Sequence, residues 1–137
     1  MGIEENKEGE ANMNCIRIYS DKNGESHFDE IEIELTETNF APPAPPMRLS
    51  EFHPATQYAF CVFPSGWVGD WHPTPAKQLF FVLSGELAGQ VSDGEMRHLK
   101  SGKAALIEDT KGKGHKSWVV NDEDVVTVVV QVPDNGQ

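Results

Sequence analysis

Hydrophobic and polar residues follow one another in short runs along most of this chain, and the pattern predicts strands. Residues 57–63 place Tyr58, Phe60 and Val62 on one face of an extended segment and Ala59, Cys61 and Phe63 on the other. Short runs of this kind, bounded by Gly, Pro, Asn or Asp, are typical of β-strands. We expect further strands at residues 15–19, 31–35, 79–83, 86–91, 96–99, 104–107, 116–120 and 125–132.

No stretch from Ala41 onward has the period of a long helix, so the sequence predicts an all-β domain. Residues 1–14 are charged and poor in apolar side chains, and we expect them to form a flexible acidic tail. Residues 15–137 then form one domain of common size. Within it, the sequence FAPPAPP at 40–46 offers few N–H donors, which favours an extended strap across the outside of the domain.

The clearest candidate chemistry lies in the stretch 66–85. His72 and Thr74 are two residues apart, so in a strand their side chains share a face. Gln78 and Phe80 share a face of the apolar run that follows. Polar groups on the inner faces of neighbouring strands predict a site inside a small barrel.

A second histidine, His115, follows the glycine-rich sequence KGKG and precedes another apolar strand. Asp109, in the same loop, could orient it. Trp67 and Trp71 flank the first motif and could line the mouth of a pocket for a cyclic or apolar ligand. His98 is expected on the outside of a hairpin, and nothing in their surroundings suggests a role for His27 or His53.

Each candidate also has a purely structural explanation. His72 could be a hydrogen-bonded histidine at a pocket mouth, and Gln78 could satisfy backbone groups at the start of a buried strand. His115 could cap its loop, and Trp67 could be ordinary packing. Together, however, the three polar residues favour a common site.

The spacing of these residues resembles the first motif of the cupin superfamily, G-x5-H-x-H-x3-E-x6-G. The corresponding residues here are Gly66, His72, Thr74, Gln78 and Gly85. Thr74 and Gln78 therefore stand where the motif has a second histidine and a glutamate.

The second cupin motif, G-x5-P-x-G-x2-H-x3-N, is matched more loosely. Gly102 and His115 are present, but Glu108 and Thr110 replace the proline and glycine, and Val119 replaces the asparagine. The loop before the histidine is also two residues longer than in the motif.

The resemblance implies a cupin jelly-roll β-barrel with its motif core at residues 52–132. In cupins, ligands from the two motifs hold a divalent metal such as Fe, Mn, Ni or Zn inside the barrel. Carried over, the ligands would be His72, Gln78 and His115. The exchange of carboxylate for amide weakens such a site, although some cupin sugar isomerases have glutamine at this position.

Three functions follow as expectations. The first is a metal-dependent enzyme of oxygenase or isomerase type, with His72 and His115 as catalytic residues. The second is a metal-free protein that binds or senses a small ligand in the same pocket, and a purely structural interaction module is a third. In each small-molecule case the expected substrate contacts are Trp67, Trp71, Thr74, Phe80 and Asp109.

Charge narrows the range of partners. The chain has a formal net charge of −11, which disfavours nucleic acids and anionic membranes as partners. Its acidic N-terminus does not have the pattern of a signal peptide. Cys15 and Cys61 provide no disulfide framework, so we expect a reducing cytoplasm. The family resemblance implies a homodimer paired through edge strands.

Overall fold

A computed structural model describes residues 2–5 and 11–134, and strands are the only regular elements in this part of the chain. The large sheet is built from β1 (Gly2–Glu5), β2 (Ala11–Ser20), β3 (Ser26–Ile33), β6 (Gln57–Phe63), β8 (Gln78–Ser84), β11 (Ala104–Ile107) and β13 (Val125–Gln131). The small sheet consists of β7 (Val68–His72), β9 (Glu86–Val91), β10 (Met96–Lys100) and β12 (His115–Val119). A separate pair is formed by β4 (Thr36–Thr38) and β5 (Met47–Leu49).

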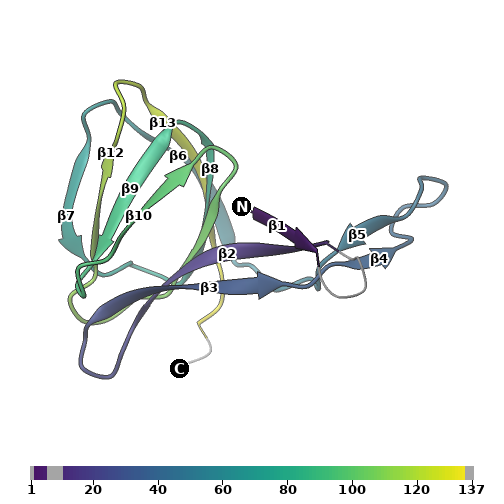
Figure 1. Ribbon diagram of the computed structural model, residues 1–137, viewed down its shortest axis with the longest axis horizontal. Helices are drawn as coiled ribbons and strands as arrows, with labels where there is room; N and C mark the ends of the chain where they lie inside the picture. The colour runs from purple at the N-terminus through teal and green to yellow at the C-terminus, as the bar shows by residue number, and fades with distance from the viewer. Residues whose placement is uncertain (1, 6–10, 135–137) are drawn as a thin grey trace.

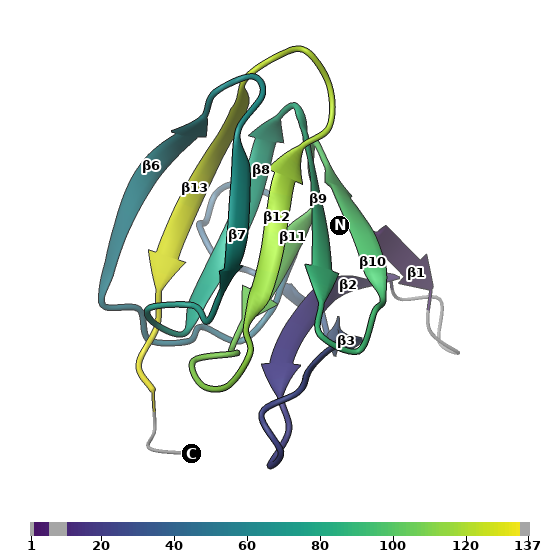
Figure 2. The same cartoon turned by 90° about the vertical axis from the view of Figure 1, so that its left-hand side faces the viewer.

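The two main sheets face each other as layers, which Figures 1 and 2 show from two sides. The large sheet has the order β1-β2-β11-β8-β13-β6, with β3 paired to β2, and the small sheet has the order β10-β9-β12-β7. The prediction of an all-β fold is confirmed. The expected closed barrel is not formed, because no ladder among the described strands joins the two sheets.

Short turns carry the chain from one sheet to the other. Gly85 alone separates β8 from β9, and its φ of +85° is available to glycine at little cost. A Cβ at this position would lie 2.8 Å from the Asp124 carbonyl oxygen. A side chain at this crossing would therefore collide with the turn that precedes β13.

The core lies between the sheets, where alternate residues of each strand point inward. Phe80 and Val82 of β8 are buried there, as are Val125 of β13 and Leu87 and Val91 of β9. Their neighbours Phe81 and Leu83 along β8 are more exposed. The period of two that predicted these strands therefore also decides which side chains form the core.

Two segments differ from the expectations. Residues 2–5 and 11–14 lie in β1 and β2 rather than in a flexible tail, because β2 pairs with β1, β3 and β11; residues 1 and 6–10 lie outside the described part of the chain. The proline-rich segment 40–46 does not cross the body. It forms the turn of the β4–β5 hairpin, which projects from the body (Figure 1). We call residues 36–52 the arm.

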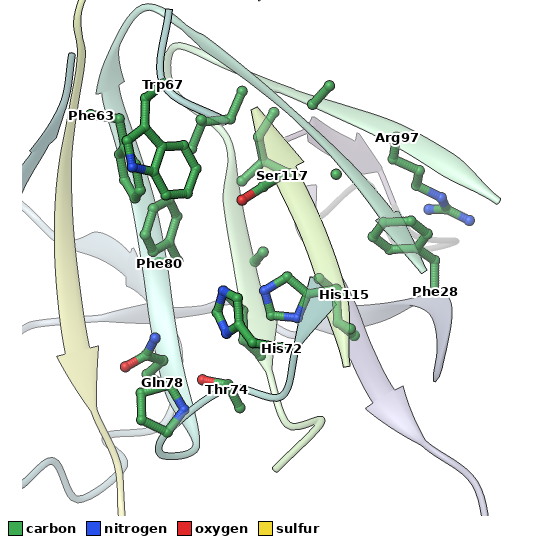
Figure 3. A pocket seen from close by; sticks show the side chains of 18 residues that line it. Phe28, Phe63, Trp67, His72, Thr74, Gln78, Phe80, Arg97, His115 and Ser117 are labelled. Atoms are coloured by element: carbon green, nitrogen blue, oxygen red, sulfur yellow. The ribbon is translucent and has the colours of Figure 1, made fainter. Parts of the chain in front are cut away.

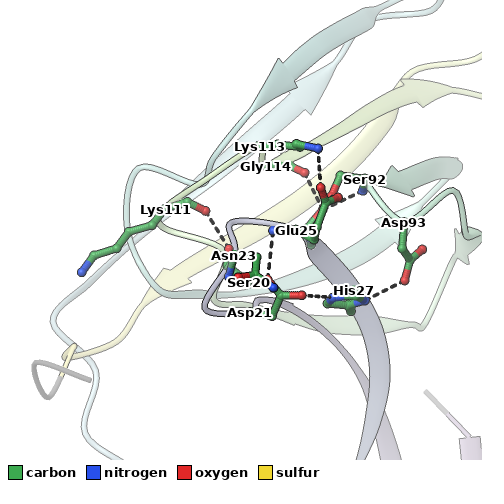
Figure 4. Close-up of polar contacts among 11 residues, drawn as sticks. Ser20, Asp21, Asn23, Glu25, His27, Ser92, Asp93, Lys111, Lys113 and Gly114 are labelled. Carbon is green, nitrogen blue, oxygen red and sulfur yellow. Dashed lines mark hydrogen bonds and ion pairs between the residues drawn. The ribbon is translucent and has the colours of Figure 1, made fainter.

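The tip of the β2–β3 hairpin is fastened to the loop that precedes β12 (Figure 4). The Ser26 hydroxyl donates a hydrogen bond of 2.6 Å to the Gly114 carbonyl oxygen, and Lys113 forms an ion pair with Glu25. His27 lies between the carboxylates of Asp21 and Asp93, at 2.7 and 2.8 Å. We call these contacts the polar latch, and they hold the loop next to His115.

No helix in the described part of the chain has the length and apolar character needed to cross a membrane.

Candidate functional site

A cavity of about 240 Å³ lies between the two sheets (Figure 3). Most of its lining is apolar and comes from both sheets. The larger apolar side chains around it are Ile18, Phe28, Phe63, Trp67, Phe80, Leu87, Leu99 and Ile107. The polar side chains that line it are Thr74, Gln78, Arg97, His72, His115 and Ser117. The cavity can therefore hold an apolar body while offering polar contacts at limited points.

His72 and His115 meet at this cavity, as the sequence predicts. They are directly opposite each other on the antiparallel strands β7 and β12, and their ring centroids are 5.1 Å apart. The backbone is crowded at this point. Gly114 has a φ of +73°, and a Cβ there would lie 2.1 Å from the His72 carbonyl carbon and oxygen. Glycine at position 114 is what allows the two histidine strands to approach.

His115 is held in place by a buried carboxylate. Its Nδ1 lies 2.6 Å from Asp109 Oδ2, and the two residues are 8% and 0% exposed. The Thr74 N–H donates a hydrogen bond of 3.0 Å to the Asp109 carbonyl oxygen, which ties the Asp109 backbone to the first motif. Because Nδ1 is engaged by Asp109, the Nε2 atom of His115 remains for a further partner.

His72 is more exposed and is oriented by its own neighbour. Its Nδ1 donates a hydrogen bond of 2.8 Å to the Pro73 carbonyl oxygen, so in the neutral ring Nε2 carries the lone pair. The two rings therefore both present Nε2 to further partners. A pair of imidazole nitrogens beside an apolar cavity can accept hydrogen bonds from a ligand or move a proton.

Thr74, Gln78, Phe80 and Trp67 also line the cavity, in agreement with the sequence analysis. The buried Thr74 hydroxyl donates a hydrogen bond of 2.8 Å to the Ala76 carbonyl oxygen, so its proton is already used within its own turn. The Trp67 ring packs edge-on against Phe63, with centroids 4.7 Å apart. Asp109 acts from behind His115 and is not part of the lining.

Trp71 is not brought to the cavity. It is exposed and precedes His72 in β7, so its side chain points to the opposite side of the sheet. There the Lys116 ammonium group lies 5.6 Å from the Trp71 ring centroid. His98 is exposed, as expected, with its Nδ1 2.6 Å from a Glu86 carboxylate oxygen.

Many lining residues were not identified as site residues from the sequence, among them Phe28, Arg97 and Ser117. The guanidinium carbon of Arg97 lies 5.4 Å from the Phe28 ring centroid, and its Nε donates to a Glu95 carboxylate oxygen at 2.7 Å. Arg97 shares a face of β10 with Leu99, which also lines the cavity. The apolar Leu99 two residues away is the signal in the sequence that could have placed the Arg97 stem inside.

The donors at the cavity do not fit a resident metal ion well. Within residues 2–5 and 11–134, no three His, Cys, Asp or Glu side chains form a group that could hold a metal. Two imidazoles and the Gln78 amide bring no negative charge, whereas divalent ions in open sites usually have a third imidazole or a carboxylate. The nearby carboxylate, Asp109, is bonded to His115.

No protein-family model matches the chain, and no curated protein matches it by sequence. Solved structures to which it is similar include a cupin domain. This is the cupin domain of Cnp3 from Schizosaccharomyces pombe, with 13% identity and a TM-score of 0.47, covering 89% of this chain and 84% of that one. Another is protein NMB1881 from Neisseria meningitidis, with 16% identity and a TM-score of 0.44, covering 56% of this chain and 72% of that one.

Proposed function

We propose that this chain binds a small molecule with a largely apolar body between the two sheets of a cupin-type jelly roll, with the polar group of the ligand at His72 and His115. The observation that carries the proposal is the meeting of these two rings at an apolar cavity, with His115 oriented by the buried Asp109. Residues far apart in the sequence converge there. A polar pair serving only the fold would not need an adjoining cavity.

The size and lining of the cavity limit the ligand. A volume of about 240 Å³ suits a molecule of one or two rings rather than a nucleotide or a peptide. Phe63, Trp67 and Phe80 provide ring faces and edges for it to pack against. Burial of apolar area contributes about 25 cal/mol per Å², so such a ligand gains most of its affinity from these walls.

Catalysis at this site would use the same two histidines. A ligand proton within reach of a histidine Nε2 can be taken up there, and Asp109 would act as the positioning residue that keeps the His115 ring in place.

Cys15 and Cys61 are both free. Free thiols are typical of a reducing compartment, so we propose that the protein resides in the cytoplasm.

Binding of 5-fluoroindole, followed by ¹⁹F NMR of the probe and ¹H NMR of the histidine rings, tests the proposal. We expect saturable binding of one probe per chain, with shifts of the His72 and His115 ring resonances. Ala105 lines the cavity and is 2% exposed, so Ala105→Leu should fill it and weaken binding at least about tenfold. Trp71→Ala, which changes the outside of the small sheet, should leave binding unchanged.

Thermal unfolding of Ala105→Leu shows whether the variant is folded. Ser117→Leu provides a second way to occupy the cavity, from the opposite sheet. Undiminished binding in both folded variants, or no binding of the probe at millimolar concentration, would contradict the proposal.

A metal-dependent enzyme of oxygenase or isomerase type is the second candidate. It is favoured by the contact between Asp109 and His115, because histidine ligands of metals commonly donate their other ring N–H to a carboxylate. His72, Gln78 and His115 would then hold Fe, Mn, Ni or Zn. Elemental analysis of untagged protein decides between the candidates: one metal per chain, lost in His72→Ala, supports the enzyme. Metal well below one per chain supports the metal-free ligand site.

A further inference from the structure

Among the described residues that line the cavity, one side chain carries a permanent charge. It is Arg97 of β10, whose side chain is 29% exposed. The other described lining residues are apolar or neutral polar, apart from the two histidines, and none of them is an aspartate or a glutamate. The chain as a whole has a net charge of −11. A lining with one cation and no carboxylate is therefore complementary to a negatively charged group on the ligand.

Arg97 lies where the two sheets adjoin without a ladder, at one end of the cavity (Figure 3). It extends from β10, the last strand of the small sheet, toward β3 of the large sheet. Its guanidinium carbon is 5.4 Å from the Phe28 ring centroid, and its Nη1 is 3.9 Å from a Glu30 carboxylate oxygen. The Phe28 ring packs against the planar guanidinium group and limits its orientations.

The guanidinium group still has N–H donors for a ligand. Within the described part of the chain, Arg97 donates one hydrogen bond, from Nε to Glu95 at 2.7 Å. The 3.9 Å between Nη1 and Glu30 is too long for a hydrogen bond. The Glu95 and Glu30 side chains are 41% and 58% exposed, so water competes for both contacts and each contributes little. The terminal N–H groups therefore remain available to a carboxylate.

The residues between Arg97 and the histidines leave room for a ring. Arg97 pairs across the ladder with Gly89, and Gly89 pairs with Ser117, so these three cavity residues form one row across the small sheet. His115 precedes Ser117 by two residues on β12. The spacing of strands and residues in a sheet places the Cα atoms of Arg97 and His115 roughly 12 Å apart. The middle of the row has no large side chain, so a ligand can lie over it and reach both ends.

We propose that the ligand is an aromatic or other cyclic carboxylic acid, with its carboxylate bound by Arg97 and a hydroxyl or N–H at its other end donating to His72 or His115. This inference rests on the proposed function and adds a charge and an orientation to the ligand. A planar guanidinium group matches a carboxylate through two parallel N–H···O hydrogen bonds. A cationic ligand would be repelled by Arg97, and a neutral one would not use its charge.

Titration calorimetry with a matched pair of ligands is the test. 4-Hydroxybenzoate and its neutral amide, 4-hydroxybenzamide, share the ring and the hydroxyl and differ in charge. We expect the wild type at pH 7 to bind the acid at least about tenfold more tightly than the amide, because hydrogen bonds between charged groups are stronger than those to a neutral acceptor. Arg97→Gln should abolish this preference and change the affinity for the amide less than about threefold.

Lys100→Gln is the matched control for the loss of one positive charge. Lys100 lies on the same strand, is exposed and is not part of the cavity lining. The substitution should change neither affinity more than about twofold, because solvent and salt screen a charge at this distance. Arg97→Lys keeps the charge without the planar fork and should retain part of the preference for the acid.

The outcomes separate this proposal from the proposed function. A wild type that binds 5-fluoroindole but does not prefer the acid to the amide overturns the carboxylate site and leaves the apolar ligand site intact. Equal losses of acid and amide binding in Arg97→Gln, with an unchanged unfolding midpoint, would mean that Arg97 only shapes the wall, which overturns the carboxylate site as well. No binding of 5-fluoroindole, acid or amide at millimolar concentration contradicts both proposals.

Discussion

His27 shows how one side chain can make the fold depend on pH. Both of its ring nitrogens lie within 2.8 Å of a carboxylate oxygen, from Asp21 on one side and Asp93 on the other. The hydrogen bond to Asp21, followed by that to Asp93, raises the pKa of His27 above its ordinary value. Tyr19, whose ring centroid lies 5.4 Å from that of His27, packs beside it, and Glu25 and Lys113 pair nearby in the same latch.

The sign of the pH effect follows from this direction. Because the folded pKa of His27 is above the unfolded value of about 6.5, its contribution to stability is complete below that pH. The contribution is lost as the pH rises through the folded pKa. We expect the unfolding midpoint of the wild type to fall between pH 6 and pH 9.

His27→Gln provides the control for this prediction. The variant should unfold at a lower temperature than the wild type at pH 6, and the two midpoints should converge toward pH 9. A wild-type midpoint that falls no more steeply than that of His27→Gln would show that another group is responsible.

The positions of some residues could be predicted from the sequence, and those of others could not. The meeting of His72 and His115 was predicted from their positions in two motifs that resemble those of cupins. The prediction that Trp71 lines the pocket was wrong, although Trp71 directly precedes His72, because adjacent strand residues point to opposite sides of a sheet. The contacts of His27 depend on Asp93, which is 66 residues away in the sequence, and no local pattern reveals such a pairing.

At the scale of elements, the approach of β7 to β12 depends on a backbone that only glycine tolerates. Gly114 has a left-handed φ and lies against the His72 carbonyl group. We expect Gly114→Ala to lower the free energy of unfolding by at least about 3 kcal/mol, from conformational strain and the backbone clash together. Chemical denaturation measures the loss, and binding of 5-fluoroindole should disappear with it.

Gly66→Ala is the matched control for this substitution. Gly66 has a φ of +84°, but a Cβ there would meet no atom within 4 Å. It should cost only the conformational penalty of about 1–2 kcal/mol and leave probe binding intact. Equal losses in the two variants would mean that crowding at His72 has no role.

Strand positions followed closely from alternation where strands are bounded by turn residues. The bounds of β6, β9 and β11 are those expected from the sequence. The arm was not foreseen, because prolines exclude a ladder at 40–46 without saying where the flanking residues pair. The strand β1 and the first four residues of β2 were missed, because their stability comes from pairing with other strands and not from their own composition.

For the whole molecule, net charge is the dominant property that composition alone reveals. A charge of −11 on 137 residues implies repulsion within the folded chain, which salt screens. We expect the unfolding temperature at pH 7.5 to rise by about 3–8 °C between 20 mM and 500 mM NaCl. The same comparison near the sequence pI of about 4.7 is the control, since the effect should nearly vanish there. A falling unfolding temperature at pH 7.5 would mean that favourable ion pairs outweigh the repulsion.

The ladder between β2 and β11 is parallel, and it joins Ile16 to Ala105. During synthesis on the ribosome, the hairpin of β2 and β3 is therefore complete long before its permanent neighbour has been translated. Until β11 emerges, the edge of β2 that β11 will occupy has no partner from that strand. This chain thus has a built-in period of vulnerability, in which a chaperone or a neighbouring nascent chain competes for a strand that the finished protein encloses.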